Sequence, residues 1–157
     1  MGEPATKDPV RASVTVPVPA ERAFDVFARL AAWWPREYTW AADTLEDIGI
    51  EPGEGGHCFE RGPFEFTCHW GRVLLWDPPG RLVFTWQIAP DRVPQPNPAK
   101  ASEVEVRFED AGTAGTRVDL EHRAFARHGD GGSAYRQAMA SPEGWPFILD
   151  RYAAALR

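Results

Sequence analysis

The 157-residue sequence lacks a long apolar run and an excess of basic residues. No hydrophobic stretch approaches the length of a membrane span, and the N-terminal MGEPATKDPV has no apolar segment typical of a secretory signal. The formal net charge of −6 argues against nucleic acid or a membrane as a partner, because nucleic acids and anionic membranes both attract basic surfaces. We therefore expect a cytoplasmic protein.

Cysteine is scarce, and the common catalytic motifs are missing. The two cysteines occur as His57-Cys58 and Cys68-His69, four soft ligands that raise the question of a zinc site. Neighbours on a strand point to opposite faces, so one metal ion could reach only one member of each pair. We expect reduced thiols and no metal. No Gly-rich phosphate loop or nucleophile elbow is present, so we expect no cofactor and lean against enzymatic activity.

Size and composition indicate one folded domain. Hydrophobic residues make up 43% and charged residues 25% of the chain, which is ordinary for a globular protein. Residues 1–9 combine glycine, proline and mixed charge, and we expect them to form a disordered lead-in. Residues 10–157 are numerous enough for a single domain with a substantial core.

Two different periodicities open this domain. Apolar residues at every second position from Val10 to Val18 predict a strand. From Ala20 the apolar positions follow helical spacing as far as Trp34, and Pro35 should end that helix.

A series of strand-like segments follows, bounded by glycine and proline. The predicted strands lie near 44–51, 56–61, 66–76, 81–88, 102–109 and 116–123. The proline-rich stretch 89–100 predicts a stiff loop, which serves either as a spacer or as a lid over a cavity.

The chain ends in helical patterns. A short segment covers 133–140, and a longer helix that starts near Ser141 or Trp145 has Leu149 on its apolar face. Strands joined by short turns predict an antiparallel sheet, which curls when it has this many members. The expected fold is therefore α+β: a curved antiparallel sheet, a short helix after the first strand, a long C-terminal helix, and an apolar cavity between sheet and helix.

With these segments in place, the chain resembles a known family. The similar stretches are VPVPAERAFDVF, WW at 33–34, GG at 55–56 with the following Glu60, WGRVLLWDPPGRLVFTWQ, GTRVDLEH and GWPFILDRYAAAL. They resemble the helix-grip (SRPBCC) superfamily of START and pollen-allergen-like domains, and within it the branch named for the activator of heat-shock protein 90 ATPase. The family's hairpin after Glu60 usually turns on Asp-Gly, whereas Phe64-Glu65 stands here.

The resemblance implies a sheet that grips the C-terminal helix around an apolar cavity. Related domains bind lipids, sterols or polyketides, some cyclise or dehydrate them, and others are chaperone partners. We predict that the residues of the site bind a ligand and that none of them is catalytic. The candidate ligand-binding residues are Trp34, Glu60, Phe84, Trp86, His122, Trp145 and Leu149.

Two of these candidates are ionisable, and each has two interpretations. Alternation in TRVDLEH places His122 on the apolar face, where it either bonds to a neighbouring element or turns a free nitrogen to the ligand. Glu60 either lies in the cavity or pairs at its rim with Arg61 or Arg72.

We expect the protein to bind a small hydrophobic or amphipathic molecule in the cavity. Two alternatives stay open. One is a cyclase or dehydratase that uses His122 and Glu60 for acid–base chemistry. The other is a chaperone-interacting module. Formation of a homodimer is a further open possibility.

Overall fold

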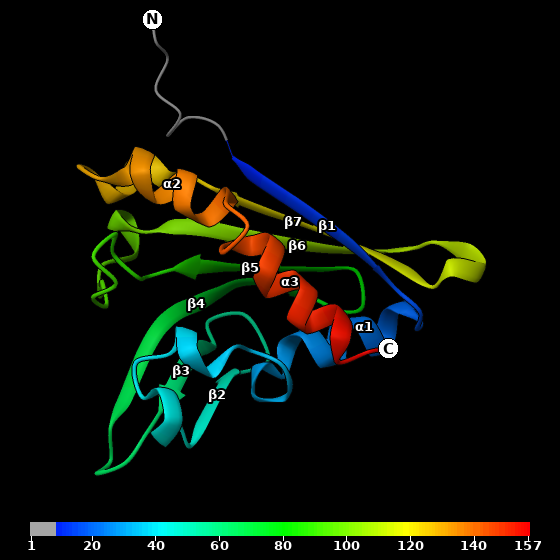
Figure 1. Ribbon diagram of the computed structural model, residues 1–157, viewed down its shortest axis with the longest axis horizontal. Helices are drawn as coiled ribbons and strands as arrows, with labels where there is room; N and C mark the ends of the chain where they lie inside the picture. The colour runs from blue at the N-terminus through cyan, green and yellow to red at the C-terminus, as the bar shows by residue number, and fades with distance from the viewer. Residues whose placement is uncertain (1–8) are drawn as a thin grey trace, which may run out of the picture.

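An antiparallel sheet of seven strands dominates the computed structural model, which describes residues 9–157 (Figure 1). In space the strands follow the order β1-β7-β6-β5-β4-β3-β2, and all neighbours are antiparallel. The strands are β1 (Val10–Val16), β2 (Asp47–Ile50), β3 (His57–Arg61), β4 (Thr67–Asp77), β5 (Arg81–Trp86), β6 (Ser102–Asp110) and β7 (Thr116–Arg123). The lead-in expected at 1–9 lies, except for Pro9, outside the described residues.

Helices cover one face of this sheet, as predicted for an α+β helix-grip fold (Figure 1). The α-helices of the described part are α1 (Ala20–Ala28), α2 (Gly132–Ala140) and α3 (Trp145–Ala154). Of the two predicted starts for the last helix, Trp145 is correct, and Pro146 lies in the first turn, where a missing N–H is tolerated. None of the described helices has the length and apolar character needed to cross a membrane.

The long C-terminal helix is bent, because a turn at 141–144 separates α2 from α3. The backbone N–H of Gly144 donates to the carbonyl of Ser141 over 2.9 Å. A Cβ atom on Gly144 would lie 2.2 Å from the carbonyl oxygen of Met139, so only glycine permits this close approach. The two halves therefore continue in different directions across the sheet.

The first helix is shorter than the helical pattern predicts. It ends at Ala28, and the expected continuation to Trp34 is wrong, because Arg29 leaves the helical region with φ −93° and ψ 72°. A short 3₁₀ turn, η2 (Leu30–Ala32), follows. The indole N–H of Trp33 donates to the carbonyl of Val26 over 3.0 Å and so satisfies an acceptor at the helix end.

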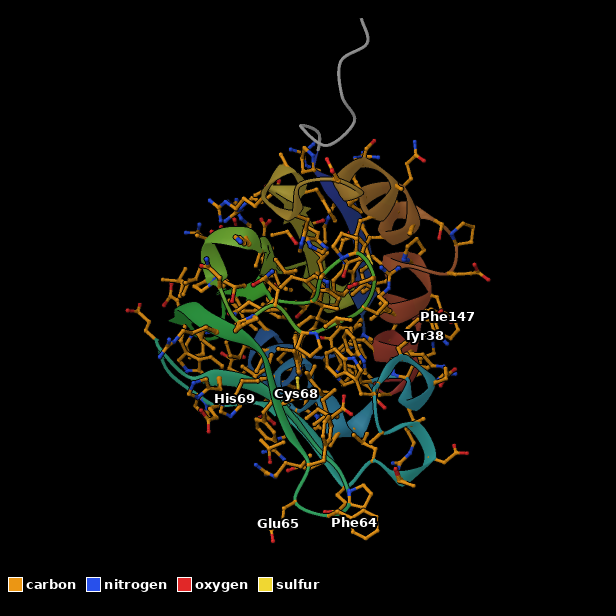
Figure 2. All side chains as sticks on the ribbon, turned by 90° about the vertical axis from the view of Figure 1, so that its left-hand side faces the viewer. Tyr38, Phe64, Glu65, Cys68, His69 and Phe147 are labelled. Carbon is orange, nitrogen blue, oxygen red and sulfur yellow. The ribbon has the colours of Figure 1, made fainter. Side chains whose placement is uncertain are left out.

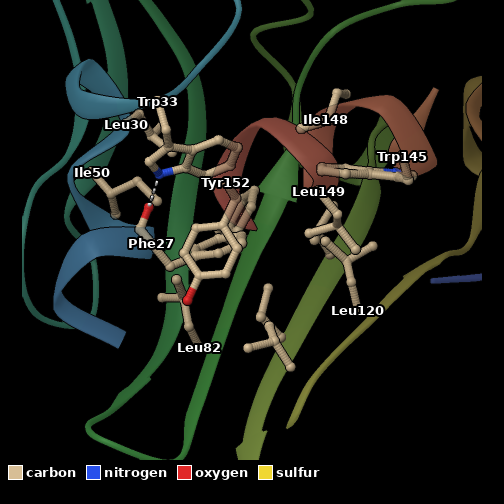
Figure 3. Packing of buried hydrophobic residues seen from close by; sticks show 14 of the residues in the cluster. Phe27, Leu30, Trp33, Ile50, Leu82, Leu120, Trp145, Ile148, Leu149 and Tyr152 are labelled. Atoms are coloured by element: carbon tan, nitrogen blue, oxygen red, sulfur yellow. Dashed lines mark hydrogen bonds between the residues drawn. The ribbon is translucent and has the colours of Figure 1, made fainter. Parts of the chain in front are cut away.

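The core lies between α1, α3 and the sheet (Figure 3). The ring of Tyr152 on α3 contacts those of Phe27 and Trp33, in each case with centroids 5.2 Å apart. The hydroxyl of Tyr152 donates to the carbonyl of Ala23 over 2.7 Å. Leu149, with 1% of its surface exposed, packs in the same core. This packing fixes α3 over the sheet.

The hairpin between β3 and β4 has an unusual turn. Arg61 pairs with Thr67, and the turn places Phe64 at φ 60° and Glu65 at φ 63°, a left-handed conformation that favours asparagine and glycine. The side chain of Phe64 is 100% exposed at the tip of the hairpin, beside Glu65 (Figure 2). The two residues thus adopt the conformation that an Asp-Gly turn would favour.

The cysteines and histidines of this hairpin lie on opposite faces. The rings of His57 and His69 stack with centroids 4.0 Å apart, whereas Cys58 and Cys68 are free and buried. Burial raises the pKa of both thiols, and Glu60 helps to raise that of Cys68 to about 11. Both cysteines are therefore protonated near neutral pH. In the described part of the chain, no group of three or more His, Cys, Asp or Glu residues could hold a metal ion.

Candidate functional site

A cavity of about 420 Å³ lies between the sheet and the bent helix, where the segment after α1 also contributes to the wall. Its volume falls in the range of about 300–1,000 Å³ that is typical of small-molecule sites. The principal wall residues are Glu60, Trp70 and Trp86 from the sheet, Tyr135 and Met139 from α2, and Ile148 from α3.

Three tryptophans form a continuous aromatic wall. The rings of Trp34 and Trp70 are stacked, with centroids 6.2 Å apart and an interplanar angle of 28°. Trp86 contacts both, at 6.2 Å from Trp34 and 5.7 Å from Trp70. Indole rings offer large apolar faces, so this wall suits a flat hydrophobic molecule.

A tyrosine supplies the polar group next to this wall. The indole N–H of Trp86 donates to the hydroxyl oxygen of Tyr135 over 2.6 Å. Burial raises the pKa of Tyr135 to about 12, although the bond from Trp86 and the charge of Arg92 act in the opposite direction. The hydroxyl therefore keeps its proton near neutral pH. The guanidinium carbon of Arg92 lies 4.5 Å from the centre of the Tyr135 ring.

Two loops meet over the cavity. The indole N–H of Trp40 donates to the carbonyl of Arg92 over 2.8 Å, and both residues line the cavity. The hydroxyl of Tyr38 donates to the carbonyl of Glu143 over 2.8 Å and so joins the same segment to the bend of the helix. Within 89–100, Arg92 belongs to the cavity lining, so this loop contributes to the wall at that residue.

Glu60 holds the segment that contains Trp40. Its carboxylate is 1% exposed and accepts the backbone N–H of Trp40 over 3.1 Å and that of Ala41 over 2.7 Å. The expected rim pairing with Arg61 or Arg72 is wrong, because both arginines bond elsewhere. The carboxylate instead satisfies backbone donors of a loop that the strand pattern leaves undefined.

His122 is buried behind the cavity wall and bonded at both ring nitrogens. The indole N–H of Trp145 donates to its Nδ1 over 2.9 Å. Its Nε2 therefore carries the proton of the neutral ring and donates to Ser102 Oγ over 2.7 Å. Burial, and next the charge of nearby His128, keep the pKa of His122 well below its usual value. Of the two interpretations, bonding to a neighbouring strand and helix describes this residue.

The predicted site residues fall into two groups. Those that line the cavity are Trp34, Glu60 and Trp86. Those that are buried outside its lining are Phe84, His122, Trp145 and Leu149. Trp145 contacts Trp86 with ring centroids 5.4 Å apart and so supports the wall from behind. Glu60 and His122 form no bond with each other within residues 9–157.

Several wall residues were not among the candidates. Trp70 shares the buried face of β4 with Cys68, an alternation that the sequence shows. Tyr135 and Met139 have the i, i+4 spacing of one helix face, which could have indicated their common side. The proline-rich pattern of 89–100 allows a lid over the cavity, but it does not indicate that Arg92 is the residue that reaches the lining.

A second hollow, of about 480 Å³, lies on the outer face of the sheet and is lined mainly by charged residues. Its buried carboxylate, Glu105, forms ion pairs with Arg81, Arg107 and Arg123. Burial raises the pKa of Glu105, but hydrogen bonds from Arg123, Arg107 and Arg81 outweigh it and lower the pKa to about 2. The charged lining of this hollow is therefore explained by a salt-bridge network around Glu105.

A curved sheet that encloses an aromatic cavity with a bent helix defines a helix-grip protein. The chain belongs to the family of activator of Hsp90 ATPase homolog 1-like proteins, whose sequence model matches residues 17–157. No curated protein matches the chain.

Solved structures with the same fold include two with substantial sequence identity. The anthrahydroquino-γ-pyrone synthase Txn09, complexed with SUM, is 36% identical, with a TM-score of 0.65 and coverage of 94% of this chain and 96% of that one. The self-sacrificing resistance protein CalC from Micromonospora echinospora is 29% identical, with a TM-score of 0.65 and coverage of 96% and 94%. Protein NE0264 from Nitrosomonas europaea, at 14% identity, a TM-score of 0.65 and coverage of 94% and 93%, shares the fold alone.

Proposed function

We propose that the protein binds a small, flat, hydrophobic or amphipathic molecule in the cavity between the sheet and the bent helix. The observation that carries this proposal is the wall of three contacting indoles, Trp34, Trp70 and Trp86, around a space of about 420 Å³. Burial of a fused ring system against these faces would be favourable, because apolar surface on both sides leaves water.

The name of one relative supports a flat ligand. The synthase at 36% identity is named for an anthrahydroquino-γ-pyrone, which is a fused aromatic ring system. The match covers 94% of this chain and 96% of that one, so the similarity extends over nearly the whole fold. A fused-ring molecule fits the aromatic wall of this chain better than a long flexible lipid, whose ordering on binding costs more entropy.

Because the same name denotes a synthase, an enzyme such as the cyclase or dehydratase alternative is a second candidate function. The acid–base pair first considered for it, His122 and Glu60, does not support it. Both oxygens of Glu60 accept backbone N–H groups, and both ring nitrogens of His122 are bonded behind the wall. Binding is therefore the function that the geometry supports best. The chaperone-interacting alternative rests on the family name alone.

A matched pair of variants on α2 tests the proposal. Ala138 and its neighbour Gln137 are both exposed to solvent, but only Ala138 also lines the cavity. We expect fluorenone, a flat aromatic ketone, to quench the tryptophan fluorescence of the parent and of Gln137→Phe saturably. Ala138→Phe should weaken this binding at least about tenfold, because the added ring occupies ligand space.

Equal binding by the two variants would show that the probe binds outside the cavity. Absence of saturable quenching by fluorenone, naphthol and a medium-chain fatty acid would contradict the proposed function. Native mass spectrometry of the freshly purified protein complements the titration, because a retained small molecule would identify the natural ligand directly.

A further inference from the structure

The buried polar side chains of the cavity wall are unequally satisfied. Each carboxylate oxygen of Glu60 already has a partner, because one accepts the backbone N–H of Trp40 and the other that of Ala41. The groups that remain without partners are donors. A buried donor without an acceptor is uncommon and calls for an explanation at each position.

The first such donor is the hydroxyl of Tyr135. An indole N–H only donates, so in the 2.6 Å bond with Trp86 the tyrosine oxygen is the acceptor. Its own proton has no acceptor among the residues that the structure describes. Burial raises the pKa of Tyr135 to about 12, so this proton is retained near neutral pH. Tyr135 lines the cavity, and an oxygen on a bound molecule could accept its proton.

The second donor is the indole N–H of Trp70. Trp70 is 2% exposed and belongs to the same wall, and its Nε1 has no hydrogen-bond partner within residues 9–157. Trp70 also contacts Trp86, with ring centroids 5.7 Å apart, and Trp86 bonds Tyr135. The residues that carry the two unsatisfied donors thus both contact Trp86, and both line the cavity.

We propose that the cavity recognises a hydrogen-bond acceptor oxygen on its ligand, such as the carbonyl of a fused-ring ketone or quinone, through Tyr135 and Trp70. This inference rests on the proposed function and specifies the chemistry of the bound molecule. Arg92 adds to the preference, because its guanidinium over the Tyr135 ring favours an oxygen that carries partial negative charge.

Fluorenone and fluorene test the inference, since they share one ring skeleton and differ in a carbonyl against a methylene group. We expect Tyr135→Phe to reduce the ratio of fluorenone to fluorene affinity by about tenfold, the equivalent of one hydrogen bond. Trp70→Phe should reduce the same ratio. Tyr152→Phe is the matched control, because the Tyr152 hydroxyl donates to Ala23 and lies outside the wall. It should leave the ratio unchanged.

Infrared spectroscopy of fluorenone bound to the parent protein provides a first readout that needs no variant. Hydrogen bonding should lower the carbonyl stretching frequency in the parent complex relative to fluorenone in hexane, and Tyr135→Phe should reverse part of this shift. If fluorenone binds with an unshifted carbonyl band, the inference is wrong while the proposed function stands. If neither compound binds, both are wrong.

Discussion

The indole N–H of Trp145 donates to Nδ1 of His122 over 2.9 Å, and this bond joins the first turn of α3 to β7. The other ring nitrogen of His122 continues the chain of hydrogen bonds. Its Nε2 lies 2.7 Å from Ser102 Oγ, and Ser102 Oγ lies 2.8 Å from Nε2 of His128. A polar chain thus runs from the helix through two strands. It explains why an ionisable ring occupies the apolar face of β7.

Replacement of His122 by Phe should destabilise the fold. The phenyl ring conserves volume, but it leaves the N–H of Trp145 without its acceptor and removes one of the two side-chain partners of the Ser102 hydroxyl. We expect a loss of roughly 2–4 kcal/mol in the free energy of unfolding, measured by urea denaturation. His69→Phe, at an exposed position on β4, should change it by less than about 0.5 kcal/mol. An unchanged midpoint for His122→Phe would contradict the structural role of the bond.

Stability should also fall in mild acid. The pKa of His122 is lowered by burial and by His128, and burial lowers that of His128. The two histidines therefore resist protonation in the folded state. In the unfolded chain they take up protons once the pH falls below 6.5, the ordinary pKa of histidine. The free energy of unfolding should decrease by up to about 1.4 kcal/mol per pH unit and per histidine as the pH falls below that value.

Urea denaturation at a series of pH values from about 7.5 to about 5 measures this slope. His122→Phe should flatten the profile, because one of the two depressed groups is gone. Glu105, whose pKa is lowered to about 2 by its arginine partners against the effect of burial, contributes at lower pH. Its stabilisation is lost only below about pH 4.5. A parent profile that is flat between neutral pH and about pH 5 would contradict the prediction.

The docking of α3 can be tested with a matched pair of leucines. Leu149 is 1% exposed in the core beneath α3, whereas Leu74 on β4 is 44% exposed. Leu149→Ala should cost roughly 2–5 kcal/mol, since it leaves a cavity in a packed core. Leu74→Ala should cost less than about 1 kcal/mol. Equal thermal midpoints for the two variants would mean that α3 does not seal the core.

The contrast between β7 and α1 shows what sequence periodicity can predict. On β7 every second residue from Thr116 to His122 is buried, as the alternation predicts, because a strand held by two neighbours keeps its period. The helical pattern of α1 continues past its true end. At that end the carbonyl of Val26 accepts both the backbone N–H of Arg29 and the indole N–H of Trp33, contacts that periodicity does not reveal.

The candidate site also shows where prediction from sequence periodicity ends. Alternation identifies residues that face the helices, but it does not indicate which of them the helices cover. Trp86 lines the cavity, whereas His122 on the same concave face is covered by Trp145. The partners of Glu60 lie in an irregular loop 19 and 20 residues earlier in the chain. Such contacts depend on tertiary structure, and no local pattern encodes them.

The strained turn of the β3–β4 hairpin gives the last prediction. Glu65 has φ 63°, which costs a residue with a Cβ atom more than it costs glycine. Glu65→Gly should therefore raise the free energy of unfolding by about 0.5–1 kcal/mol and the thermal midpoint by roughly 1–4 °C. The residue is exposed, so little packing is lost with its side chain.

The matched control is Glu109→Gly, at an exposed position in the extended strand β6. There glycine adds freedom to the unfolded chain without relieving strain, so the variant should lose about 0.5–1 kcal/mol. The same substitution should thus change stability in opposite directions at two exposed sites. A lower midpoint for Glu65→Gly as well would show that position 65 does not require a left-handed conformation, and that the turn is not strained.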